Sequence, residues 1–220
     1  MKIWSDGWRM ATLSCLDTKS ANAKTGDMIQ LSVLPVRETT TDSIKNKRDH
    51  VQCGDCPLKA SLGGPCYVNP VSYNAPQKKN AARAVQAVPE LRKPLRFGAY
   101  GDPGFIPLDK MHELASAAPG HAGYTHQWHK IDKGYSAYIM ASIDHIDNGQ
   151  TREKAKDLGY RTFRILADGD ELGKNEIICP NSTKGVQCAD CLLCAGTSKG
   201  AKDIAIVGHG APSKLRSFAQ

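Results

Sequence analysis

Four of the eight cysteines lie close together near the end of the chain, in the stretch CPNSTKGVQCADCLLC. Thiolates bind soft or borderline metals, and four in one short loop can close a tetrahedral zinc site or hold an iron–sulfur cluster. The close triplet C-x2-C-x2-C favours a cluster, because structural zinc more often uses two separated C-x2-C pairs. Iron–sulfur, zinc and unliganded thiols therefore remain the three interpretations for Cys179, Cys188, Cys191 and Cys194.

A second group, Cys53, Cys56 and Cys66, has the spacing C-x2-C-x9-C and only three thiols. His50 would supply a fourth ligand and close a zinc site. Alternatively, a small molecule would occupy the open position of an iron held by three cysteines. A closed site only holds a loop together, whereas an open site can do chemistry. Cys15 stands alone and is expected to be a small buried hydrophobic residue.

The start of the chain indicates the cellular compartment, and the compartment bears on whether these thiols bind metal or form disulfides. MKIWSDGWRMATLSC contains charged residues and no continuous apolar core, so it does not read as a secretory signal. No apolar run reaches the roughly 18 residues that a membrane-spanning helix needs. We therefore expect a cytoplasmic protein, and in that reducing compartment clustered cysteines bind metals more often than they form disulfides.

The length of 220 residues favours a single domain over residues 1–220, with metal loops at about 50–66 and 179–194. Of the 220 residues, 40% are hydrophobic and 23% are charged, as in globular proteins. The net charge of +7 favours a polyanionic partner, either a nucleotide or a nucleic acid. Lys and Arg are spread along the chain, however, so a solvated basic surface is the competing interpretation. The sequence carries no indication of oligomeric state.

Strand-like and helix-like segments alternate along the chain. Apolar runs such as AYIMASI and IAIVG are typical of parallel strands that are buried on both faces. The strands are too few for a closed eight-stranded barrel, so the pattern predicts an incomplete barrel or an open, mostly parallel sheet. The expected strands cover residues 27–36, 95–101, 121–128, 136–143, 161–166 and 203–209, and the expected helices cover 77–88, 107–118 and 151–159.

Polar residues follow two of the expected strands, where parallel α/β proteins bind ligands. His126 in GYTHQWHK would form part of a pocket wall, or it would simply pack within the fold. Asp144 in SIDHID would serve as an acid–base group or cofactor contact, or it would cap the following helix. We take His126 and Asp144 as the candidate catalytic residues.

Together, the strand at 29–34, the first cysteine group and the segment GAYGDP resemble the opening of radical S-adenosylmethionine enzymes. The resemblance implies that Cys53, Cys56 and Cys66 hold a [4Fe–4S] cluster whose open iron binds the methionine part of the cofactor. It further implies that the terminal four-cysteine loop holds an auxiliary cluster. The spacing C-x2-C-x9-C differs from the C-x3-C-x2-C that is usual in that family. The cofactor contacts implied are Gly101 and Asp102 for the amino group, and Ser142 and Asp144 for the ribose.

A closer resemblance covers most of the chain. The stretches CGDCPLK, GAYGDP, GYTHQW and CPNSTKGVQCADCLLC are similar to those of uncharacterised cysteine-rich proteins carried by phages and mobile elements. That group brings no established activity. The first hypothesis is therefore an iron–sulfur enzyme that uses S-adenosylmethionine and acts on a nucleotide or nucleic acid. The second is a non-catalytic, zinc-stabilised protein that binds nucleic acid or a host partner.

Overall fold

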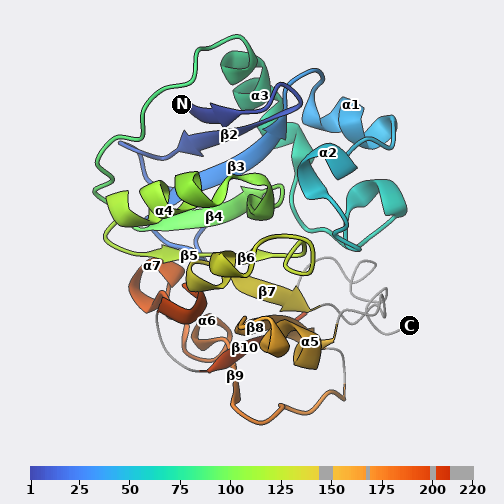
Figure 1. Cartoon of the computed structure of the whole chain (residues 1–220), viewed down its shortest axis with the longest axis vertical. Coiled ribbons are helices and arrows are strands. Elements are labelled where there is room, and N and C mark those ends of the chain that lie inside the picture. Colours follow the sequence, from blue (N-terminus) through green and yellow to red (C-terminus); the bar gives the residue numbers. More distant parts are fainter. Residues whose placement is uncertain (144–150, 167–168, 199–201, 209–220) are drawn as a thin grey trace.

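Two five-stranded sheets form the framework of the computed structural model, which describes residues 1–143, 151–166, 169–198 and 202–208. The first sheet has the order β1-β2-β3-β4-β5 and the second has the order β6-β7-β8-β10-β9. β1, β2 and β3 are antiparallel neighbours, and all the other pairs are parallel. Only Gly123 separates β5 from β6, so the chain passes directly from one sheet into the other (Figure 1).

The strands are β1 (Lys2–Ser5), β2 (Arg9–Ser14), β3 (Ile29–Pro35), β4 (Leu95–Tyr100), β5 (His121–Ala122), β6 (Tyr124–Thr125), β7 (Met140–Ile143), β8 (Thr162–Leu166), β9 (Glu176–Ile178) and β10 (Asp203–Val207). The helices are α1 (Thr40–Lys45), α2 (His50–Cys53), α3 (Asn74–Ala81), α4 (Leu108–Ala117), α5 (Arg152–Asp157), α6 (Pro180–Lys184) and α7 (Cys188–Cys191). Short 3-10 turns cover Ala60–Leu62, Pro70–Tyr73, Pro103–Phe105, Lys133–Ala137 and Gly196–Ser198.

This arrangement confirms an α/β fold with open, mostly parallel sheets. Within the described residues the strands do not close into a barrel. β3 is buried at every position, as expected for a strand that is covered on both faces. The expected strands at 27–36, 95–101, 161–166 and 203–209 correspond to β3, β4, β8 and β10, although His209 lies outside the described residues.

One face of the sheets carries the main apolar core. α4 lies across β4 (Figure 1), and its buried Met111 and Leu114 belong to the same apolar cluster as Leu95 and Phe97. These helical residues are three apart and so lie on one face of α4. α5 contributes the buried Ala155 to this cluster. On the opposite face of the first sheet, Met10, Leu34 and Tyr100 form a smaller apolar cluster against which Ala81 of α3 packs.

Two expected elements differ from the observed ones. The expected helix at 77–88 stops at Ala81, because Gln86 instead donates its backbone N–H to Lys2 O (2.9 Å) and extends along the edge of β1. This tertiary contact outweighs the helix propensity of the Ala- and Lys-rich segment. The expected strand at 136–143 begins only at Met140, after a 3-10 turn over Lys133–Ala137. The segment 121–128 forms two short strands rather than one.

None of the helices in the described part of the chain has the length and apolar character needed to cross a bilayer.

A buried carboxylate joins α5 to the second sheet. Asp203, at the start of β10, is 3% exposed and accepts a hydrogen bond from Thr162 N (2.9 Å). Its Oδ2 lies 2.6 Å from Arg152 Nη2 and 2.9 Å from Lys156 Nζ. Burial alone would raise the pKa of Asp203, but these three partners together lower it below its usual value. The ionised form therefore stabilises the fold.

We expect Asp203→Asn to lower the free energy of unfolding at pH 7 by about 3 kcal/mol, because it leaves two cations beside a neutral amide. Since the folded-state pKa is lowered, the stabilisation is present above the unfolded-state pKa of about 4 and is lost as pH falls through the folded-state pKa. Urea unfolding at pH 7 and below pH 4 should therefore show a smaller acid-induced loss in the variant. Asp17→Asn at an exposed position is the control. Equal acid sensitivity in Asp203→Asn and wild type would contradict this role.

Candidate metal and ligand cavity

One cavity collects the cysteines of both loops. It has a volume of about 460 Å³, which is within the roughly 300–1,000 Å³ typical of small-molecule sites. β4, β6, β8 and β10 contribute side chains to its wall, and most of the other lining residues lie outside the strands. The two cysteine groups form separate loops in the sequence, and the fold brings them to the same cavity. The cysteines that line it are Cys53, Cys56, Cys66, Cys179, Cys188, Cys191 and Cys194.

Backbone and carboxylate contacts fold the first cysteine loop. Asp49 precedes α2, is almost completely buried, and accepts hydrogen bonds from Ser61 N (3.0 Å) and the Ser61 hydroxyl. Cys66 N donates to Leu58 O (2.9 Å), which closes the loop on itself. Asp102 N donates to Gln52 O (2.7 Å), so the loop is attached to the segment that follows β4. The loop therefore has a defined place at the carboxyl end of β4.

The second cysteine loop is attached to three separate parts of the fold. Cys179 N donates to Ala205 O (2.7 Å), Gly123 N donates to Cys194 O (3.0 Å), and Cys188 N donates to Lys24 O (3.2 Å). Arg161 adds a fourth attachment, because its Nη1 donates to the carbonyls of residues 193 and 196 on either side of the last cysteine, at 2.8 and 2.6 Å. Arg161 could not be recognised as an anchor from the sequence, because a charged residue next to a strand carries no specific signal.

The thiols of each loop influence one another electrostatically. Burial raises the pKa of the Cys194 thiol, and the other three thiols of its loop raise it further. Burial also raises the pKa of Cys53 well above its usual value, and the Cys56 and Cys66 thiols raise it further. The raised pKa values of Cys53 and Cys194 favour their protonated forms, and a bound metal would favour the thiolates.

The donor chemistry of both loops fits a thiophilic metal or a cluster. All eight cysteines are free thiols, so none of the seven in the cavity is consumed by a disulfide. Within the described ranges, however, no three His, Cys, Asp or Glu side chains are already close enough together to hold a metal ion. A metal would therefore have to draw the thiols together as it bound, as happens when metal binding is coupled to folding.

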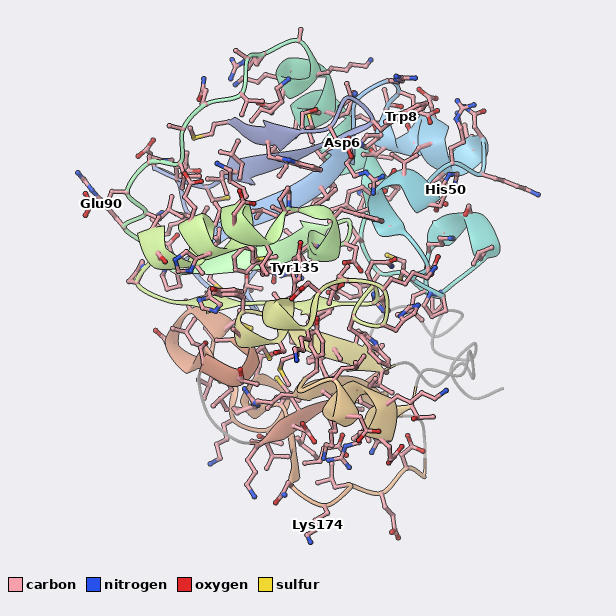
Figure 2. The ribbon with its side chains drawn as sticks, viewed as in Figure 1. Asp6, Trp8, His50, Glu90, Tyr135 and Lys174 are labelled. Atoms are coloured by element: carbon pink, nitrogen blue, oxygen red, sulfur yellow. The ribbon has the colours of Figure 1, made fainter. Side chains whose placement is uncertain are left out.

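The two candidate histidines occupy different places. His126 follows β6, is 9% exposed and lines the cavity, and its Nε2 lies 3.7 Å from Cys56 Sγ. His50 begins α2, is exposed and is not part of the cavity wall (Figure 2). His126 is therefore better placed than His50 to join the first three cysteines.

The segment after β4 organises the wall around His126. Asp102 is 4% exposed, and its carboxylate accepts hydrogen bonds from Gly104 N (2.8 Å), His126 N (2.8 Å) and the Thr125 hydroxyl. These contacts saturate the carboxylate and fix the backbone of His126. Gly101 and Asp102 both line the cavity, as a cofactor contact would require.

The remaining candidate residues follow β7. Ser142 is 3% exposed, lines the cavity, and accepts a hydrogen bond from Trp128 Nε1 at its backbone carbonyl (3.1 Å). Asp144 lies outside the described residues.

Comparison of the chain with protein-family models, curated proteins and solved structures found no match.

Proposed function

We propose that this protein is an iron–sulfur protein whose two cysteine loops hold clusters beside a shared ligand cavity. The observation that carries the proposal is the convergence of seven free thiols, from loops more than a hundred residues apart, on one cavity. Cys53, Cys56 and Cys66 would hold one cluster and leave a position open, and the four cysteines of the second loop would hold another. Bound there, clusters supply one-electron chemistry.

The surrounding residues support a radical S-adenosylmethionine-like role in an incomplete barrel. Gly101, Asp102 and Ser142 all line the cavity beside the three-cysteine loop. This is the placement that a cofactor-binding function would need, with a nucleotide or nucleic acid as the expected substrate. The Asp102 carboxylate accepts a hydrogen bond from the backbone N–H of His126 and so positions the imidazole at the cavity wall.

A closed zinc site in the first loop is the second candidate. The observation that favours it is the 3.7 Å separation of His126 Nε2 and Cys56 Sγ, which offers a fourth protein ligand of the type found in Cys3His zinc sites. In that case the loop would be stabilised by zinc without an open position, and the protein would bind nucleic acid or a partner through its basic surface.

Two histidine variants separate the open site from the closed one. If the first loop holds an open iron–sulfur cluster, His126→Ala should keep the full metal content of protein purified without oxygen. If zinc is closed by His126, the same variant should lose about one metal per chain, while His50→Ala keeps it. Cys56→Ser should lose the first-loop metal in either case, and Cys15→Ser should lose none. Full metal retention in Cys56→Ser would contradict metal binding at this loop.

A further inference from the structure

Arg96 is a cation on the inner wall of the cavity. It is the second residue of β4, lies opposite Gln30 of β3 and Ala122 of β5, and lines the cavity. The neighbouring Leu95 and Phe97 face the core under α4. Because side chains alternate along a strand, Arg96 points away from that core. A charged side chain at such a position is costly unless something compensates it.

The contacts of Arg96 within the described chain are few. Its Nη2 donates to the Tyr67 hydroxyl (3.3 Å), which lies 3.5 Å from the Tyr124 hydroxyl. No carboxylate among the described residues lies within ion-pair distance of the guanidinium. A guanidinium has five N–H donors in a planar fork, and one phenol oxygen satisfies only a small part of them.

Among the described residues, the groups around the cavity offer Arg96 no carboxylate partner. Burial works to lower the pKa of its guanidinium, but the nearby tyrosine hydroxyls raise it above the usual value, so the group keeps its charge. Lys24 also lines the cavity and adds positive charge. The one carboxylate in the described cavity wall belongs to Asp102, whose oxygens already accept three hydrogen bonds.

We propose that Arg96 is the anion-binding residue of the cavity, and that the ligand is a small molecule that carries a phosphate or a carboxylate group. The planar fork of arginine matches both groups with two parallel hydrogen bonds. Tyr124 and Phe163 stack with ring centroids 4.3 Å apart in the same wall and provide an aromatic surface for the rest of the ligand. The inference does not depend on the metal; it rests on the proposed function only for the choice of nucleoside probes.

The test uses two matched pairs of probes with the full chain and isothermal titration calorimetry. Adenosine 5′-monophosphate against adenosine tests the phosphate, and S-adenosylhomocysteine against 5′-methylthioadenosine tests the carboxylate. In at least one pair the wild-type protein should bind the anionic member roughly 10- to 100-fold more tightly. Arg96→Gln should abolish this preference, and Arg96→Lys should keep part of it. Arg92→Gln, at an exposed position, should keep all of it.

Metal content and thermal unfolding of the same variants separate this inference from the proposed function. Arg96 and Cys188 of the second cysteine loop line the same cavity; burial raises the pKa of Cys188, and Arg96 acts in the opposite direction. If Arg96→Gln lost its metal but retained the preference for the anionic probe, the residue would balance thiolate charge rather than bind a ligand. Absence of any anion preference in the wild type would likewise overturn the proposal, whatever metal the protein holds.

Discussion

Replacing Cys191 and Cys194 together with serine is expected to remove the metal of the second cysteine loop and to lower the free energy of unfolding by about 4 kcal/mol or more. Losses of this size are typical when a structural metal is removed. The loop has little apolar surface of its own to replace the metal, since none of the residues of α6 and α7 is buried. It also closes one side of the cavity, so ligand binding should weaken with the metal loss.

Metal analysis and urea unfolding measure the two effects on the same samples. Cys15→Ser is the matched control, because Cys15 lies outside both loops and outside the cavity lining. It should retain the wild-type metal content and change the free energy of unfolding by less than about 1 kcal/mol. A double serine variant with a full metal complement would show that the second loop is not a metal site.

Gly101→Ala is expected to destabilise the protein by about 3 kcal/mol or more and to reduce metal binding in the first cysteine loop. Gly101 has φ +74°, which costs a non-glycine residue about 1–2 kcal/mol. An added Cβ would also lie 2.3 Å from Val33 O and 3.0 Å from Gln52 O, both of them backbone atoms. β3 or the segment that carries the first cysteines would have to move.

Gly63→Ala separates the clash from the backbone strain. Gly63 has a similar φ of +72°, but a Cβ there would meet nothing within 4 Å. Its variant should lose only about 1–2 kcal/mol and keep the metal. The difference between the midpoints of urea unfolding then measures the close packing at Gly101. Equal losses of unfolding free energy in the two variants would mean that the backbone around Gly101 moves to accommodate the added Cβ at no extra cost.

Elements with a strong local pattern were predictable from the sequence. β4 and α4 have a clear apolar run and an apolar stripe, and both appear within a residue or two of the expected ranges. The expected helix at 151–159 corresponds to α5, which Thr151 caps by accepting a hydrogen bond from Lys154 N (3.3 Å). The hairpin of β1 and β2 was missed, although Asp6 and Gly7 between two apolar segments are a typical hairpin signal.

The composition of the cavity depends on topology and could be predicted only in part. The cysteines stand out in the sequence, but His50 was favoured as the additional ligand because it is close to them along the chain. The structure places His126 next to Cys56 instead, because β6 and β4 end at the same side of the fold. Arg96 was missed since its role depends on which face of β4 meets the cavity, which cannot be known before the helices are placed.

The most direct measurement is the metal and acid-labile sulfide content, with the visible absorption spectrum, of wild-type protein purified without oxygen. The proposed function predicts a brown protein with broad visible absorption and about four irons and four sulfides for each [4Fe–4S] cluster, lost from the first loop in Cys56→Ser and from the second in the double serine variant. A colourless protein with stoichiometric zinc, or with no metal at all, would contradict the iron–sulfur account.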